Sequence, residues 1–358
     1  MKYDYWMHNI TGIGSKKIRY LLQYAGSTKE VFSMKEAQLA EIPNIHKSDR
    51  EKILKSAATW DVDGEYNKLT NAGIRFISKN HDHYPEKLTH IVDSPFGIYV
   101  KGSLEENLSN CAAIVGSRTC SEYGGNMARA FAERLAANGV TIVSGMAYGI
   151  DSAAHYGALK AGGKTLAVLG CGVNVCYPEK AEKLFRTIPE HGALISEYHP
   201  DAKPVSGYFP QRNRLISALA DLVLIMEARE KSGSLITADF ALEQGKDIYA
   251  LPGRVSDDLS RGCNRLIQQG AGILVSPEEL LLEMGINADK HKKNKVVSKN
   301  LLEKEELLLY SCFDLYSRSI NELVQNSGLP IYRVTEIIGI LIQKGLIEET
   351  FINCYKKT

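Results

Sequence analysis

The stretch Ala113-Ile114-Val115-Gly116-Ser117-Arg118 decides the fold of the central part of this chain. Its apolar residues predict a β-strand, and the glycine, hydroxyl and arginine after them predict a turn into a helix. Gly116 lets the backbone turn at the carboxyl edge of a parallel sheet, where the free N–H groups of a helix N-terminus attract anions. Arg118 adds a planar guanidinium suited to phosphate oxygens. The stretch therefore predicts an anion-binding turn.

The composition is that of a globular chain with room for more than one domain. Of its 358 residues, 44% are hydrophobic and 24% are charged. Residues 1–9 include Lys2, Asp4 and His8, and no later stretch is apolar over the length that a bilayer requires. We therefore expect a soluble, cytoplasmic protein with no membrane partner. The net charge of +1 gives no general attraction for polyanions, so any phosphate binding must come from a local cluster.

The seven cysteines are scattered along the sequence. The closest pair, Cys171 and Cys176, has no partner ligands at the spacing of a metal site. Buried, reduced thiols are the favoured interpretation. We expect no disulfide, no metal and no cofactor.

Residues 1–68 predict a small helical domain with tight glycine turns, of helix-hairpin-helix or SAM-like type. The segment Ile10-Thr11-Gly12-Ile13-Gly14 resembles a helix-hairpin-helix, in which turn amides contact a backbone phosphate. A second copy, Ile42-Pro43-Asn44-Ile45, has no glycine. We favour a structural role for the pair, with a DNA contact as the alternative.

Residues 69–286 alternate strand and helix patterns, which predicts a doubly wound, Rossmann-like α/β domain. The predicted strands are apolar almost throughout, as expected for a sheet covered on both faces. They span residues 98–100, 112–115, 141–144, 165–169, 193–196, 222–226 and 247–251.

A basic linker and a winged helix are predicted after this domain. The linker covers residues 287–299, and the residues that mark it are Lys290, Lys292, Lys293, Lys295 and Lys299. Residues 300–358 then predict two helices around the turn Gly328-Leu329-Pro330, followed by a small hairpin. The outward residues of the second helix include Tyr332, Arg333, Glu336, Gln343 and Lys344, which carry little net positive charge. A protein contact is therefore at least as well supported as DNA reading.

Further glycine and hydroxyl loops are expected at the same sheet edge as Gly116. They are Ser144-Gly145-Met146-Ala147-Tyr148-Gly149, Gly170-Cys171-Gly172 and Ser232-Gly233-Ser234. Each loop alone is weak evidence, but their convergence predicts a phosphate-accepting groove. The segment Phe209-Pro210-Gln211-Arg212-Asn213-Arg214 adds a stacking ring and cations, which suit a single-stranded nucleic acid. The alternatives are that Phe209 belongs to the core and that Arg214 pairs with Asp221 or Glu197.

Common enzyme motifs do not fit the sequence. Gly162-Gly163-Lys164-Thr165 nearly spells a nucleotide P-loop, but a helix precedes it and a strand follows. Gly116 is followed by Arg118 where the second glycine of a dinucleotide fingerprint belongs, and Gly170-Cys171-Gly172 has no third glycine opening a helix. Asp151 and His155 lie four residues apart, yet Asp151 suits a capping role and a single histidine makes no metal site.

Across all three regions the chain resembles the DNA-processing protein A family, also called DprA or Smf. The stretches that carry the resemblance are residues 114–118, 144–151, 209–214, 231–238, 251–253, 262–267 and 270–271. The resemblance implies a dimeric, non-catalytic protein that binds and protects single-stranded DNA and helps to load the RecA recombinase. Natural transformation and recombination are the implied processes.

The resemblance also implies roles for individual residues. Arg118 would grip phosphate, Phe209 would stack on a base, and Gly145 would give a backbone contact. The nucleic-acid-binding residues expected in this way are Gly116, Ser117, Arg118, Gly145, Met146, Lys203, Phe209, Arg212, Asn213, Ser232, Gly233 and Ser234. Family members commonly carry a lysine where this chain has Ser206, so either Lys203 replaces it or binding is weaker. Leu266, Ile267 and Ile273 are candidates for the dimer or RecA contact and are equally suitable as core residues.

An enzyme of a related fold is the alternative function. Nucleoside-monophosphate glycosidases of this fold carry a catalytic glutamate in a P-G-G-x-G-T-x-x-E loop. Aligned on Gly233 and Thr237, this chain has Phe240 at that position. The glycosidase is therefore disfavoured.

Overall fold

The computed structural model describes residues 1–105, 108–287, 303–313, 317–351 and 353–357. The chain divides into two compact units, residues 1–288 and residues 289–358. Apart from residue 287, the predicted linker and its lysines lie outside the described residues. Among the described helices, none combines the length and apolar character needed to cross a bilayer.

In the described part of the chain, the first unit begins with six helices. They are α1 (Lys2–His8), α2 (Ser15–Ala25), α3 (Thr28–Ser33), α4 (Glu36–Ala40), α5 (Lys47–Thr59) and α6 (Val62–Asn71). Trp6, Leu21 and Ile53 belong to a core that these helices share. The region packs onto the sheet that follows, because Tyr5 contacts the aromatic rings of Phe76 and Tyr99.

The described residues of the first unit contain a nine-stranded sheet in the order β1-β2-β6-β5-β4-β3-β7-β8-β9. The strands are β1 (Ile74–Ser78), β2 (Gly97–Gly102), β3 (Cys111–Val115), β4 (Thr141–Ser144), β5 (Thr165–Val168), β6 (Gly192–Ser196), β7 (Leu222–Ile225), β8 (Asp247–Ala250) and β9 (Gly272–Ile273). Strands β3 to β9 are parallel, whereas β1 and β2 pair antiparallel at one edge. Every strand predicted from the sequence is present within two residues of its expected ends, and β1 and β9 were not predicted.

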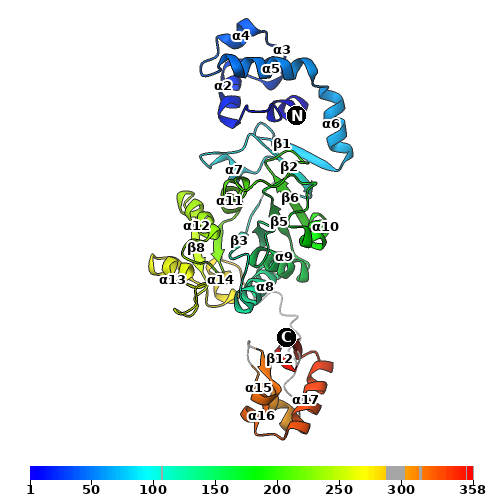
Figure 1. Ribbon diagram of the computed structural model, residues 1–358, viewed down its shortest axis with the longest axis vertical. Coiled ribbons are helices and arrows are strands. Elements are labelled where there is room, and N and C mark those ends of the chain that lie inside the picture. The colour runs from blue at the N-terminus through cyan, green and yellow to red at the C-terminus, as the bar shows by residue number, and fades with distance from the viewer. Residues whose placement is uncertain (106–107, 288–302, 314–316, 352, 358) are drawn as a thin grey trace. The chain divides into compact units, whose positions relative to one another are not determined.

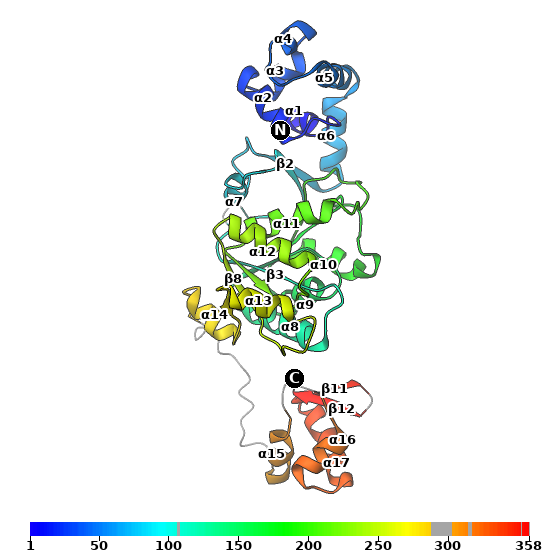
Figure 2. The same ribbon diagram turned by 60° about the vertical axis from the view of Figure 1, so that its left-hand side comes forward.

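Helices cover both faces of this sheet (Figure 1 and Figure 2). One face packs against α8 (Glu122–Ala137), α9 (Ile150–Lys160), α10 (Glu182–His191, preceded by the 3-10 turn Glu179–Ala181) and α14 (Pro277–Glu283). The other packs against α7 (Glu86–Thr89), α11 (Tyr208–Leu219), α12 (Gly233–Glu243) and α13 (Arg261–Gln268). The Rossmann-like, doubly wound prediction is confirmed, with the addition of the antiparallel edge.

The strand order reverses between β3 and β7. The chain runs outward from β3 through β4 and β5 to β6, then returns to place β7 on the other side of β3. In open α/β sheets such a switch point leaves a crevice at the carboxyl ends of the strands, where ligands bind. The turn Gly116-Ser117-Arg118 directly follows β3 and therefore lies at this point.

The described residues of the second unit form three helices and a three-stranded antiparallel sheet. The elements are α15 (Lys304–Ser311), β10 (Arg318–Ser319), α16 (Ile320–Ser327), α17 (Ile331–Gln343), β11 (Ile347–Phe351) and β12 (Cys354–Lys357), with sheet order β10-β12-β11. Leu323, Ile337 and Leu341 are fully buried between them. On α17, the Arg333 guanidinium bonds to Glu305 and Glu336 at 2.6 Å each, so this cation is neutralised by its own unit.

Candidate functional site

A cavity of about 590 Å³ lies at the switch point between β3 and β7. We call it the arginine cavity, because Arg118, Arg212, Arg229 and Lys231 all line it. It brings together most of the residues expected from the sequence, namely Gly116, Ser117, Arg118, Phe209, Arg212, Asn213, Ser232, Gly233 and Ser234. Three of the predicted loops therefore meet at this cavity, through Gly116, Ala147 and Ser232, whereas the loop Gly170-Cys171-Gly172 does not line it.

Glycine permits the close packing of the two loops behind the cavity. Gly149 has φ +73°, and a Cβ at this position would lie 2.3 Å from the backbone oxygen of Ser117. That oxygen accepts a hydrogen bond from Ile150 N–H at 3.2 Å. The loop before α9 is thus held against the turn after β3, and no larger residue fits there.

An aromatic and a cationic group face one another at the wall of the cavity. The Arg118 guanidinium lies 5.4 Å from the centroid of the Phe209 ring, within cation–π range. Phe209 packs over Gly170, where an added Cβ would lie 2.6 Å from its ring, and against Tyr177 at 5.3 Å between centroids. Arg118 itself is exposed. A charge for phosphate and a π-face for a base therefore lie side by side.

Arg212 lines the arginine cavity with only 4% of its surface exposed. Its Nη1 donates to the carbonyl oxygens of Gly145, at 2.7 Å, and Val168. Burial lowers the pKa of Arg212, and the nearby Asp151 carboxylate opposes this shift. The guanidinium thus ties the ends of β4 and β5 together and has few donors left for a ligand.

The structure places Gly145 and Met146 differently from the expectation that they contact nucleic acid. Gly145 donates its N–H to Asp151 Oδ2 at 3.1 Å and gives its carbonyl to Arg212, so both of its backbone groups are occupied. The Met146 side chain is fully buried, with φ +55°. Both residues shape the loop after β4 from within.

Asp151 also acts on that loop and not as a cap of its own helix. Its Oδ2 accepts from the N–H groups of Gly145 and Ala147 at 3.1 and 3.4 Å. Burial raises the pKa of this carboxyl, and the Arg212 guanidinium opposes the shift. His155 Nδ1 contacts Thr165 Oγ1 at 2.7 Å, and burial lowers the pKa of this histidine to about 3. Asp151 and His155 therefore have structural roles, because each is bonded to groups of the protein itself.

The N-terminus of α12 forms the opposite wall of the cavity. Ser232 caps the helix by accepting from Ser234 N–H at 3.4 Å, and Gly233 is exposed beside it. Asn213 Nδ2 donates to the Gly233 carbonyl at 3.3 Å, which joins α11 to this turn. A helix N-terminus carries partial positive charge, so it adds to the cationic field of the cavity.

The sequence reasoning did not select several residues of the lining as binding residues, among them Tyr177, Arg229 and Lys231. Arg229 and Lys231 follow β7 as Arg118 follows β3, so their position after a central strand was a usable signal. Among the described residues, neither forms an ion pair. Both are exposed and free to meet an anion.

The remaining candidates lie elsewhere. Lys203 is exposed on the loop before α11, next to the cavity residue Pro204 but not in the lining. Leu266 and Ile267 are half-buried on α13 against the sheet core. Ile273 lies on the edge strand β9 with 52% of its surface exposed.

Arg214 forms an ion pair with Glu197 at 2.7 Å, which is one of the two carboxylate partners that the sequence suggested for it. No group of three or more potential metal-ligating side chains gathers among the described residues.

Comparison with known proteins places this geometry in a family. The model of the family described as DNA recombination-mediator protein A matches residues 75–285, which is more than half of the chain. The chain belongs to the DprA family. It is 43% identical over 202 residues to the DNA processing protein DprA of Streptococcus pneumoniae, a match that covers 56% of this chain and 71% of the relative. It is 44% identical over 239 residues to the protein Smf of Escherichia coli, covering 66% of this chain and 62% of that protein.

Two solved structures of DprA proteins share the fold. The X-ray structure from Streptococcus pneumoniae has a TM-score of 0.67 and 34% identity, covering 79% of this chain and 98% of that one. A DprA structure from Helicobacter pylori has a TM-score of 0.54 and 30% identity, covering 59% of this chain and 95% of that one. The Helicobacter structure gives insight into the single-stranded DNA binding mode of that protein.

Proposed function

We propose that this chain is a recombination mediator that binds single-stranded DNA in the arginine cavity. The observation that carries the proposal is the cationic cavity at the switch point of a DprA-family fold, with Arg118 beside the Phe209 ring. Arg118, Arg229, Lys231 and the α12 N-terminus would hold phosphates, and Phe209 would support an unpaired base. Arg212, Gly145 and Met146 would act by positioning the loops.

A titration of single-stranded against double-stranded oligonucleotides at two salt concentrations tests this proposal. We expect preference for the single strand and a steep loss of affinity with salt. Arg118→Ala removes one charge-assisted contact and should weaken binding by about 1.5–3 kcal/mol, roughly 10- to 150-fold. Arg186→Ala on α10, whose side chain is 77% exposed, is the control and should bind as the parent does. Unchanged binding by Arg118→Ala would place the site elsewhere.

The partners of the protein belong to the same proposal. We infer a homodimer through α13 and the edge strand β9, where Leu266, Ile267 and the exposed Ile273 lie, because an open sheet edge with apolar side chains favours pairing. Sedimentation of Ile273→Lys should then show a shift to monomer.

We further propose that the bound strand is passed to RecA in the cytoplasm during transformation and recombination. Faster RecA filament formation on single-stranded DNA in the presence of the protein would support this step.

The outer domains are assigned as proposals too. We infer that residues 1–68 form a helix-hairpin-helix or SAM-like domain and that residues 300–358 form a winged helix. The element order of the second unit, with three helices and a terminal hairpin, supports the latter. Because Arg333 is neutralised by carboxylates, a protein contact is favoured over groove reading. A chain truncated after residue 287 should keep its affinity for single-stranded DNA.

We propose a non-catalytic role for the central domain. Phe240 occupies the position at which the related glycosidases carry their glutamate. It lies on α12, is half-buried, and does not line the arginine cavity. A nucleoside-monophosphate hydrolysis assay would test this directly. Turnover that disappears on substitution of Ser232 would reverse the assignment.

A further inference from the structure

A second cavity, of about 730 Å³, lies on the other side of α11. Its walls are the turn between α1 and α2, the loop that starts at Glu197, and the outer side of α11 with Phe240 of α12. We call it the tyrosine cavity, after Tyr198 and Tyr208. Nothing in the proposed function uses it.

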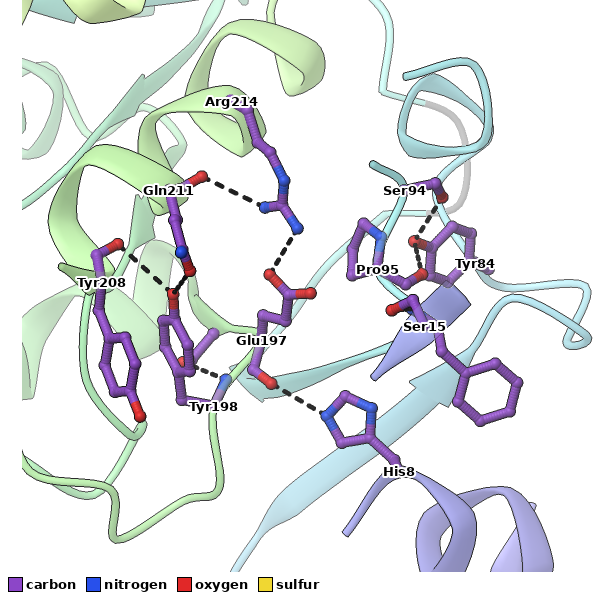
Figure 3. Close-up of polar contacts among 12 residues, drawn as sticks. His8, Ser15, Tyr84, Ser94, Pro95, Glu197, Tyr198, Tyr208, Gln211 and Arg214 are labelled. Atoms are coloured by element: carbon purple, nitrogen blue, oxygen red, sulfur yellow. Dashed lines mark hydrogen bonds and ion pairs between the residues drawn. The ribbon is translucent and has the colours of Figure 1, made fainter. Parts of the chain in front are cut away.

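The two tyrosines form a flat aromatic platform in this cavity. Their rings stack with centroids 3.9 Å apart and an angle of 13° between planes (Figure 3). The Tyr198 hydroxyl lies 3.3 Å from Gln211 Oε1, to which it donates, and this contact fixes the orientation of the platform. Because the facing sides of the two rings cover each other, an unpaired base would stack on an outer face of this pair.

A partly buried carboxylate lies beside the platform. Glu197 Oε2 bonds to Arg214 Nη2 at 2.7 Å, while Oε1 has no hydrogen-bond partner among the residues that the structure describes (Figure 3). The backbone oxygen of Glu197 contacts His8 Nε2 at 2.9 Å, which holds the loop against α1. A carboxylate oxygen in this setting accepts from an exocyclic amino group, as acidic side chains do from cytosine N4.

The charged side chains that line the tyrosine cavity have a net negative charge, which opposes a phosphate there, although the N-terminus of α2 at Gly14 also lines it and adds partial positive charge. Its charged side chains are Glu197, Asp93 and Arg214, and the last is already paired with Glu197. Burial raises the pKa of Glu197, the Arg214 guanidinium opposes the shift, and the negative charge of Asp93 adds to it. A neutral group with amino donors fits this lining better than an anion does.

The start of α11 separates the arginine cavity from the tyrosine cavity. Tyr208 and Gln211 line the tyrosine cavity, whereas Phe209 and Arg212 line the arginine cavity. A helix with its side chains is about 10 Å across, so the two cavities are close neighbours. On the loop before α11, Lys203 lies between Ala202 of the tyrosine cavity and Pro204 of the arginine cavity.

Lys203 supplies a cation for a nucleic-acid strand that would pass from one cavity to the other. It is exposed and forms no ion pair among the described residues. A phosphate that leaves the arginine cavity would therefore meet a free ammonium group at the rim, before the next base reaches the platform. The position of this cation favours a DNA strand over a protein segment as the occupant.

We propose that the tyrosine cavity binds one base of the strand held in the arginine cavity, and that Glu197 selects a base with an exocyclic amino group. The inference rests on the proposed function, because it needs a single strand in the first cavity. A comparison of cytosine with thymine separates stacking on the tyrosines from the hydrogen bond to Glu197. Both bases are pyrimidines, and only cytosine carries an exocyclic amino group.

The test compares the affinities of oligo-dC and oligo-dT of equal length for full-length protein. The parent should bind oligo-dC about fivefold more tightly. Tyr208→Ser should weaken binding of both by about tenfold, because it removes half of the platform. Tyr208→Phe keeps the ring and should bind as the parent does. Glu197→Gln should remove the preference for oligo-dC, and if this variant does not fold, the two Tyr208 variants decide.

Each alternative result has its own signature. Parent-like binding by Tyr208→Ser, together with weaker binding by Arg118→Ala, would overturn the base site and leave the proposed function intact. A Tyr208-dependent preference for oligo-dC with no effect of Arg118→Ala would support the base site and contradict the arginine cavity. If a short arginine-containing peptide binds the parent but not Tyr208→Ser, while oligonucleotide binding is unchanged, the cavity is a peptide site and the proposal is wrong.

Discussion

The arginine cavity and the tyrosine cavity lie on two sides of one helix, yet their chemistry is opposite. The first gathers guanidinium and ammonium groups at a strand switch point, and the second gathers aromatic rings beside carboxylates. Neighbouring residues of α11 serve each side, since Tyr208 and Gln211 face one cavity and Phe209 and Arg212 the other. The net charge of +1 for the whole chain therefore does not reveal that one cavity is lined by cations and the other mainly by carboxylates and aromatic rings.

The largest expected effect separates two arginines of the arginine cavity. Arg212→Met leaves the carbonyls of Gly145 and Val168 without their donor and the buried Asp151 without its nearby cation. We expect a loss of about 3–5 kcal/mol in the free energy of unfolding, measured by denaturant titration. Arg118→Met, at an exposed position, should change this free energy by less than about 0.5 kcal/mol. Equal stability of the two variants would show that Arg212 does not hold the loops.

A glycine beside each cavity gives the next comparison. Gly149 and Gly12 both have positive φ, +73° and +81°. A Cβ on Gly149 would lie 2.3 Å from a backbone oxygen, whereas a Cβ on Gly12 would meet only the flexible end of Lys52 at 2.9 Å. Gly149→Ala should therefore cost roughly 3 kcal/mol of unfolding free energy, and Gly12→Ala roughly 1 kcal/mol.

Gly233→Ala supplies the control for this pair. Gly233 is exposed, and a Cβ there would have no atom within 4 Å. Its stability should match that of the parent. If Gly149→Ala is as stable as Gly233→Ala, the close contact between the two loops is not a constraint on the fold.

Much of the arginine cavity could be predicted from the sequence, because its residues follow strands. Apolar runs such as Leu222 to Ile225 give the strands, and parallel strands place their carboxyl ends at one edge, so turns like Gly116-Ser117-Arg118 must meet. The roles of Gly145, Met146 and Arg212 could not be predicted in the same way. Whether a guanidinium faces solvent or a buried carbonyl depends on packing, which short motifs do not encode.

The tyrosine cavity lay beyond sequence reasoning for a related reason. Its walls come from segments nearly 190 positions apart, as the contact between His8 and Glu197 illustrates with a separation of 189. No motif joins these segments, and only the packing of α1 on the sheet brings them together. The sequence did offer Glu197 as one possible partner of Arg214, but the open carboxylate oxygen of this pair is visible only in three dimensions.

The pH dependence of stability probes one histidine near each cavity, the half-buried His8 and the fully buried His155. Burial lowers the pKa of His8 to about 4 and that of His155 to about 3. An unfolded histidine titrates near pH 6.5, so below that pH the unfolded state binds more protons and stability falls as pH falls towards the folded pKa values. Replacing either histidine by Asn should reduce the loss between pH 7.5 and pH 5.5 by about 1 kcal/mol.

The two histidine variants should behave alike in this window, because both folded pKa values lie below pH 5.5. Chemical denaturation at the two pH values measures the effect. A loss that stays at the parent value in His8→Asn would mean that water reaches this ring and that the tyrosine cavity is wetter than its lining indicates.

The smallest expected effect concerns Lys203, which lies between the cavities. A single exposed ammonium group contributes one phosphate contact, so Lys203→Ala should weaken single-stranded DNA binding only about threefold and reduce the slope of log affinity against log salt by about 0.7. Lys183→Ala on α10, also exposed, is the matched control and should leave both quantities unchanged. Affinity measured across a salt series separates the two variants. If Lys203→Ala changes neither quantity, the strand does not cross this rim, and the two cavities would then have to bind separate ligands.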